Sequence, residues 1–112
     1  MIGRLWHGVT TNENAGKYED LLRSEVLPGI HRVDGYRGAW LLRRDVPEGA
    51  EFVTLTIFES MDAVRRFAGE DVEAAVVPEA ARKLLARFDR RSVHYTILAE
   101  PEESRQSTVN SR

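Results

Sequence analysis

The stretch EFVTLTIFES, from Glu51 to Ser60, decides the fold. It is rich in β-branched and aromatic residues and lacks Gly and Pro, so we expect a β-strand. Alternate side chains of a strand point to opposite faces of its sheet. One face would carry Val53, Leu55 and Ile57, and the other Phe52, Thr54, Thr56 and Phe58. Neither set contains a charge, so we expect both faces of this strand to be covered.

Composition narrows the class of protein. The chain has 112 residues and a formal net charge of −2, which favours one domain and argues against a dedicated nucleic-acid binder. It has no cysteine, which excludes disulfides, thiolate nucleophiles and cysteine-bound metals. The N-terminal MIGRLWHGVT is too short and mixed for a signal peptide, and no run approaches the roughly 18 apolar residues of a membrane span. We therefore expect a cytoplasmic protein without a membrane partner.

The chain before this strand predicts a strand, a helix and a second strand. The first strand is expected over residues 2–9. Thr10 and Glu13 have the spacing of a capping box, so a helix should start there. Its apolar face is formed by residues at helical spacing, namely Tyr18, Leu21, Leu22 and Val26. Pro28-Gly29 should end or kink this helix, and a strand follows over residues 36–46.

The flanks of the deciding strand carry clear turn and cap signals. Pro47-Glu48-Gly49 has the length of a hairpin connection between the second and third strands. Ser60 is a candidate N-cap for a short helix, and Gly69 a candidate end for it. These signals predict an antiparallel hairpin that leads directly into a helix.

The last third of the chain predicts a helix, a strand and a tail. Pro78 suits the first turn of a helix over residues 78–86, with Leu84 and Leu85 pointing inward. The last strand is expected within residues 88–98, with its strongest signal from Ser92 onward. Residues 99–112 are polar and lack aromatics, so we expect a disordered C-terminal tail.

This order of elements predicts one α+β domain over residues 1–98, with the βαββαβ arrangement of ferredoxin-like folds and an antiparallel sheet. Helices that cross between parallel strands of such a unit lie on one face of the sheet. The other face stays apolar, and the chain has nothing left to cover it. We therefore expect a homodimer in which two sheets pack face to face. The alternative is a monomer that leaves an apolar sheet face open.

Five stretches carry a resemblance to a known family: MIGRLWHGVT, YEDLLRSEVLPGI, GYRGAWLLRR, FVTLTIFESMDAVRRFAGED and SVHYTIL. In pattern and order, together spanning roughly residues 1–98, they resemble the antibiotic-biosynthesis-monooxygenase-like proteins of the dimeric α/β-barrel superfamily. The resemblance implies a dimeric α/β barrel with a cavity between sheet and helices in each subunit.

The resemblance also implies a chemistry. Some members oxidise polycyclic phenols to quinones with molecular oxygen and use neither metal nor flavin. Such a reaction needs a dry pocket, a flat aromatic wall and a base at the phenol. The candidate base is His94, and Arg4, which shares strand parity with Trp6, is the candidate for stabilising an oxyanion. The candidate walls for a small aromatic ligand are Trp6, Tyr36, Trp40 and Phe58.

Other readings of the same residues stay open. Packing explains Trp6 and Trp40 as well as a pocket wall does, and a lone strand histidine such as His94 is often only a hydrogen-bonded structural residue. The alternative function is therefore a non-catalytic small-molecule-binding or structural dimer module. His7 and His31 lack a paired spacing with His94, so we expect no metal site.

A second branch of the superfamily degrades haem with an Asn on the first strand, a Trp at the end of the third and a His on the following helix. The matching positions here are His7 or Gly8, Phe58 and Val76, so all three residues are absent. Haem degradation by that arrangement is not expected, and no cofactor is predicted.

Overall fold

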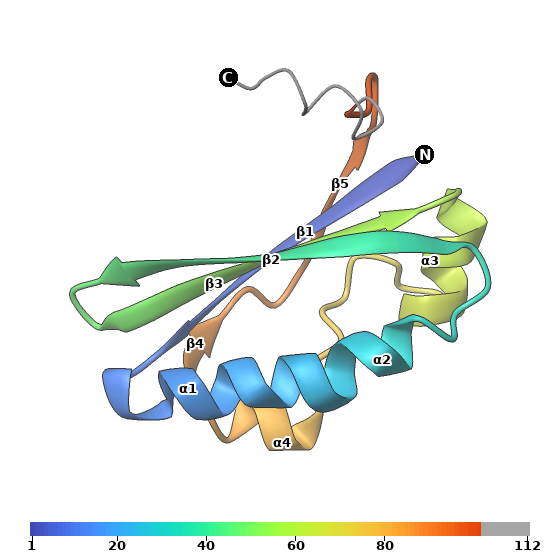
Figure 1. Ribbon diagram of the computed structural model, residues 1–112. Helices are drawn as coiled ribbons and strands as arrows, with labels where there is room; N and C mark the ends of the chain where they lie inside the picture. Colours follow the sequence, from blue (N-terminus) through green and yellow to red (C-terminus); the bar gives the residue numbers. More distant parts are fainter. Residues whose placement is uncertain (102–112) are drawn as a thin grey trace.

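The structure, a computed structural model, describes residues 1–101. A five-stranded antiparallel sheet has helices packed on one of its faces (Figure 1). The α+β ferredoxin-like arrangement predicted from the sequence is confirmed. Of the predicted tail, residues 102–112 lie outside the described part of the chain.

The first strand is the centre of the sheet. The strands are β1 (Ile2–Thr10), β2 (Tyr36–Val46), β3 (Gly49–Phe58), β4 (Leu85–Phe88) and β5 (Val93–Thr96). Their order is β2-β3-β1-β4, and β5 also pairs with β1. β4 pairs with the part of β1 near Gly8, whereas β5 pairs with the part near Arg4. One edge of β1 is thus shared by two short strands.

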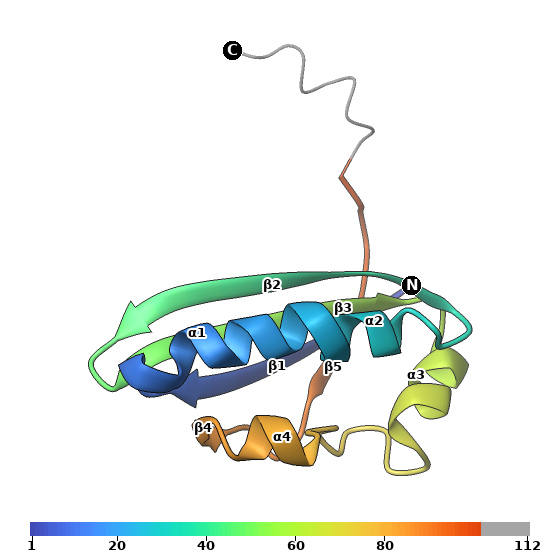
Figure 2. The same ribbon diagram turned by 60° about the horizontal axis from the view of Figure 1, so that its bottom comes forward.

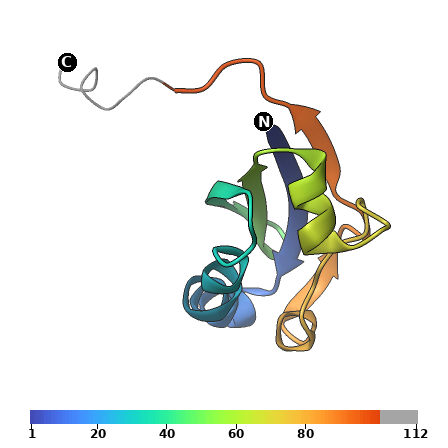
Figure 3. The same ribbon diagram turned by 90° about the vertical axis from the view of Figure 1, so that its right-hand side faces the viewer.

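The helices cover one face of this sheet. They are α1 (Asn12–Leu21), the π-helical turn η1 (Leu22–Val26), α2 (Leu27–Ile30), α3 (Met61–Ala68) and α4 (Glu79–Arg82). Figure 2 shows α1, η1 and α2 as one rod along the sheet, and Figure 3 shows α3 beside the strands. The segment that follows β5 leads away from the helices (Figures 1 and 2).

The helix-facing side of β3 forms the core. Phe52 and Phe58 are buried, and each meets an aromatic ring from a helix. The Phe52 ring lies 4.9 Å from that of Tyr18 on α1, and the Phe58 ring lies 5.7 Å from that of Phe67 on α3. Such pairs add to the free energy gained by burying apolar area. The first of the two predicted covers is therefore the helical layer.

Local signals predicted the connections around β3 correctly. Val46 pairs with Gly49 across a tight turn, which confirms the hairpin. The Ser60 hydroxyl accepts a hydrogen bond from the Ala63 N–H at 3.3 Å and caps α3. Gly69 ends α3 with φ of 90°, a conformation that favours glycine.

The predicted helix start is wrong by one residue. Thr11 is the N-cap of α1, and its hydroxyl accepts from the Asn14 N–H at 3.3 Å. Thr10 instead pairs with Ala50 as the last residue of β1, so its side chain is not available for a cap. Strand pairing therefore overrides the capping-box spacing of Thr10 and Glu13.

Pro28 does not end the first helix. The Leu27 N–H donates to the Leu22 carbonyl, five residues back, which makes the π-helical turn. Pro28 then falls in the first turn of α2, where a missing N–H costs little, and the helix continues to Ile30.

The last third of the chain differs most from the prediction. The helix predicted over residues 78–86 is only the single turn α4, because Leu85 begins β4 and pairs with Thr10. Leu84 and Leu85 do pack against the core, from a turn and a strand. The last strand predicted within residues 88–98 is confirmed as β5, whereas the short strand β4 before it was not predicted.

The other face of the sheet has no cover within the described residues. It carries Val53, Leu55 and Ile57 of β3, beside large exposed side chains of β2 and β5: Trp40, Leu42, Val93 and Tyr95. A groove of about 680 Å³ runs over this face. None of the helices within residues 1–101 is long and apolar enough to cross a membrane.

Gly49 provides a test of the hairpin geometry. Its φ is 151°, and a Cβ there would lie 2.2 Å from the Thr10 carbonyl oxygen. We expect Gly49→Ala to lower the free energy of unfolding by more than about 2 kcal/mol, because the clash is with backbone. Urea denaturation measures the change. Gly16→Ala is the matched control, since nothing lies within 4 Å of its Cβ position. This helical substitution should stabilise the protein by about 0.5–1 kcal/mol. Equal effects at both positions would contradict the geometry.

Candidate functional site

A small cavity of about 60 Å³ lies between the sheet and the helices. Its apolar wall comes mainly from the first helical rod and from β2, with Phe67 from α3. Its polar groups come from the strands, from α1 and from the start of β5: Arg4, Thr54, Thr56, Tyr18 and Ser92. Polar groups that converge on an apolar slot are the usual form of a binding site.

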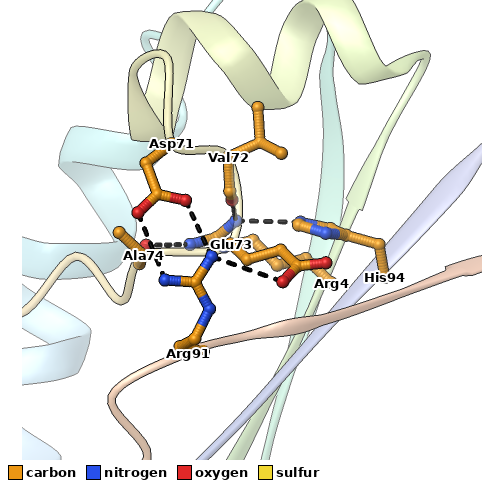
Figure 4. Close-up of polar contacts among 7 residues, drawn as sticks. All are labelled: Arg4, Asp71, Val72, Glu73, Ala74, Arg91 and His94. Carbon is orange, nitrogen blue, oxygen red and sulfur yellow. Dashed lines mark hydrogen bonds and ion pairs between the residues drawn. The ribbon is translucent and has the colours of Figure 1, made fainter.

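Arg4 is the only charged residue that lines this cavity in the described part of the chain. It is 4% exposed, and its guanidinium donates to the backbone carbonyls of Val72 at 2.5 Å and Ala74 at 2.8 Å (Figure 4). The group also lies 5.4 Å from the centre of the Phe67 ring, in cation–π contact. Burial lowers the pKa of Arg4 from its ordinary value, but an arginine remains charged at neutral pH.

His94 contacts Arg4 directly. The two residues pair across β1 and β5, and the Arg4 Nη1 lies 2.9 Å from the His94 Nε2. Arginine has no acceptor, so Nε2 must carry the lone pair and the imidazole must be neutral. Burial, and then the charge of Arg4, lower the pKa of His94, while Glu73 opposes them. His94 is thus a neutral acceptor at neutral pH.

The loop that supplies these carbonyls is held on its outer side by Arg91. Arg91 donates to both carboxylate oxygens of Asp71, at 2.8 and 3.2 Å, and to Glu73 at 3.4 Å (Figure 4). The Ser92 N–H also donates to the Glu73 carbonyl at 2.6 Å. The hydrogen bond from Arg91 lowers the pKa of Asp71. Arg4 from inside and Arg91 from outside therefore fix the same loop.

Trp6 is the one predicted aromatic wall that lines the cavity. Its indole N–H donates to the Asp89 carbonyl at 2.8 Å. A Cβ at residue 8 would lie 2.7 Å from the indole ring, so Gly8 leaves the space in which Trp6 lies. Arg4 and Trp6 share a face of β1, as their parity predicts.

The other three predicted walls lie elsewhere. Phe58 is fully buried, and Tyr36 packs edge-on against it at 6.3 Å, so both lie in the core beside Phe67. Trp40 is 55% exposed on the opposite face of the sheet. Within one chain it cannot share a cavity with Arg4, and this part of the predicted arrangement is corrected.

A β-bulge explains the misplacement of Trp40. A strict period of two puts Tyr36 and Trp40 on the same face of β2. The register shifts between Tyr36 and Gly38, so Tyr36 opposes Phe58 on the helix side while Trp40 opposes Leu55 on the other.

Several lining residues were not singled out from the sequence. Thr54 and Thr56 lie on the same face of β3 as Phe52 and Phe58, and two hydroxyls on an otherwise aromatic face were a usable signal. Tyr18 had been assigned only to the apolar face of its helix. Burial raises the pKa of its phenol, so Tyr18 stays protonated.

None of the three histidines lines the cavity, and of them only His94 contacts Arg4. The His7 Nδ1 lies 3.0 Å from Asp89, and the His31 ring lies 4.9 Å from that of Tyr36. Among residues 1–101 the structure brings together no group of three His, Asp or Glu side chains that could hold a metal ion.

The Arg4–His94 contact makes stability depend on pH. The folded-state pKa of His94 lies below its unfolded value near 6.5, so the unfolded chain binds more protons between the two values. We expect the free energy of unfolding to fall as the pH drops through this window. His94→Gln keeps an acceptor for Arg4 but does not titrate. Urea denaturation from pH 7.5 to 5 should show a smaller fall for this variant. Parallel curves for the two proteins would contradict the contact.

No protein-family model matches the chain, and none of the curated proteins matches its sequence. Solved structures do match in fold. SnoaB from Streptomyces nogalater, a cofactor-independent oxygenase solved as its N63A mutant, is 16% identical with a TM-score of 0.67, over 91% of this chain and 97% of that one.

Two further structures agree. A monooxygenase from the ActVA-Orf6 gene of Streptomyces coelicolor, in complex with nanaomycin D, is 18% identical with a TM-score of 0.59, over 92% of this chain and 91% of its own. A Bacillus cereus protein assigned as an antibiotic biosynthesis monooxygenase is 14% identical with a TM-score of 0.63, over 92% and 96%. The fold of this chain is therefore that of the antibiotic biosynthesis monooxygenase structures.

Proposed function

We propose that the protein is a cofactor-independent monooxygenase that oxidises an aromatic phenol with molecular oxygen in the cavity beside Arg4. The observation that carries the proposal is that Arg4, which lines the cavity, contacts the His94 imidazole at 2.9 Å. Support comes from a fold shared with structures described as a cofactor-independent oxygenase and a monooxygenase. Their identity to this chain is low, so the chemistry rests on the residues of the site.

The roles of the two residues follow from their contact. A phenol hydroxyl that enters between them donates its proton to the His94 Nε2, and Arg4 donates to the phenolate oxygen that results. The electron-rich phenolate reduces dioxygen, and a C–O bond forms at a ring carbon. Loss of water then leaves a quinone. One oxygen atom of O2 enters the product, and the other leaves as water with two substrate hydrogens, so the phenol supplies all the electrons.

The volume of the cavity limits the size of the substrate that can enter it. About 60 Å³ is well below the roughly 300–1,000 Å³ of pockets that hold drug-sized ligands. A polycyclic substrate can therefore enter only if a wall moves. The loop around Val76 lines the cavity and exposes that side chain, so it is the part of the wall that can move most readily, whereas Trp6 is held by its hydrogen bond to Asp89.

The same volume favours a second candidate, a non-catalytic small-molecule-binding or structural dimer module. In that case the cavity is a packing gap, and Arg4 serves only to fix the loop around Val72 and Ala74. The two candidates differ in whether His94 ever receives a proton from a ligand.

Oxygen uptake tests the proposal. Purified protein free of metal and flavin is mixed with a panel of anthrone- and naphthol-type phenols. We expect uptake above the uncatalysed rate, and a fall of about 100-fold or more in His94→Ala, as for the loss of a general base. His7→Ala, in which the altered histidine contacts Asp89 and not Arg4, is the matched control and should keep the rate. Uptake unchanged in His94→Ala would exclude His94 as the base. No uptake across the panel would favour the binding module.

We also propose that a second copy of the chain covers the open face of the sheet and forms the dimeric barrel. Trp40, Leu42, Val93 and Tyr95 expose a continuous apolar surface there, of a kind that usually marks an interface. Two sheets that pack face to face would bury it.

Sedimentation velocity tests this assembly. We expect a dimer at micromolar concentration and a monomer for the double variant Trp40→Asp, Leu42→Asp, because two buried charges would face each other at the interface. Val76→Asp alters an exposed apolar residue on the helix side and should leave the dimer intact. A stable wild-type monomer would refute the assembly.

A further inference from the structure

Arg4 is a buried cation without a carboxylate partner. The ion pairs among residues 1–101 do not include it, and the acids of the adjoining loop, Asp71 and Glu73, pair with Arg91 instead. Its contacts are the carbonyls of Val72 and Ala74 and the imidazole of His94. Carbonyl dipoles offset only part of the cost of burying a charge, so the Arg4 guanidinium still favours a negatively charged partner.

The donors of Arg4 can be counted. A guanidinium has five N–H groups in a rigid fork. Both N–H groups of Nη1 donate hydrogen bonds, one to the Val72 carbonyl and one to His94. One N–H group of Nη2 donates to the Ala74 carbonyl. Among the described residues this leaves the N–H of Nε and one N–H of Nη2 without an acceptor. These nitrogens form one edge of the fork, which matches the two oxygens of a carboxylate.

The rest of the cavity wall selects for charge and size. It offers hydroxyls from Thr54, Thr56 and Ser92, with no carboxylate to repel an anion. Its remaining surface is apolar, and Phe67 packs on one side of the guanidinium. A volume of about 60 Å³ suits an ionised group and the edge of one ring, but not a fused ring system.

We propose that the Nε–Nη2 edge of Arg4 binds an organic anion, in which a carboxylate or an ionised enol or phenol is carried on a single aromatic ring. The proposal rests on the site of the proposed function and specifies its substrate, since the ligand is bound as an anion and is smaller than a polycyclic phenol. The pKa of His94, which lies below its usual range, is consistent with this: a weak base deprotonates only an acidic hydroxyl.

Benzoate and benzamide form a matched pair of probes, because they share a shape and differ in charge. Isothermal titration of the wild-type protein should show benzoate binding at least about tenfold more tightly, the lower bound for hydrogen bonds to a charged group. Equal affinities would overturn the proposal.

Two variants locate the anion. Arg4→Lys keeps the positive charge but loses the forked geometry of the guanidinium. It should weaken the affinity for benzoate by about tenfold or more. If this variant does not fold, Val26→Phe fills the cavity beside an unaltered Arg4 and should abolish benzoate binding. Arg90→Gln removes an exposed cation whose backbone carbonyl bonds the loop at Ala75 but whose side chain does not hold the carboxylates of the loop, and should leave binding unchanged. Loss of binding in Arg90→Gln alone would place the anion on the surface and overturn the proposal.

The two proposals fail separately. Benzoate selectivity without oxygen uptake on any phenol would support the anion site and refute the monooxygenase. If the protein oxidises a phenol but binds benzoate no better than benzamide, the monooxygenase is supported and the anion site is refuted.

Discussion

The burial of one guanidinium organises the site. Arg4 lies on the central strand, and its charge has to be satisfied by whatever packs over that strand. The loop between α3 and α4 supplies backbone carbonyls, and β5 supplies a neutral imidazole. Removing the cation would leave these acceptors without a donor, which is costly in a buried setting. The conformation of the loop, the tautomer of His94 and the polarity of the cavity all depend on this one residue.

The two faces of β3 are packed in different ways. Its helix side is closed by Tyr18 and Phe67, which fixes the distance between the helical layer and the sheet. Its other side stays open, with a groove roughly ten times larger than the cavity on the helix side. A small, charged cavity and a large, apolar groove lie on opposite faces, which fits the two roles proposed for them, one in binding and one in assembly.

The sequence predicts the fold class because period, turn and cap signals agree along β2, β3 and α3, but it does not predict the short strand β4. It also placed Arg4 and Trp6 on one face of β1, since parity needs no tertiary information. The contact of Arg4 with His94 could not be derived, because the register of β5 depends on where the chain resumes after residues 89–92. The Val72 and Ala74 carbonyls carry no side-chain signal at all. The prediction for Trp40 is wrong because one bulge between Tyr36 and Gly38 reverses the faces of the strand.

The divided edge of β1 has a consequence for how such a site can change. Nine residue pairs hold β1 against β3, whereas residues 89–92 leave the sheet and bond the loop that walls the cavity. An insertion or deletion in either of these segments would reshape the wall while the frame of the sheet stays the same. Changes in these segments can therefore alter which ligand the cavity prefers while the chain still folds. The short segment between β4 and β5 can vary most in this way.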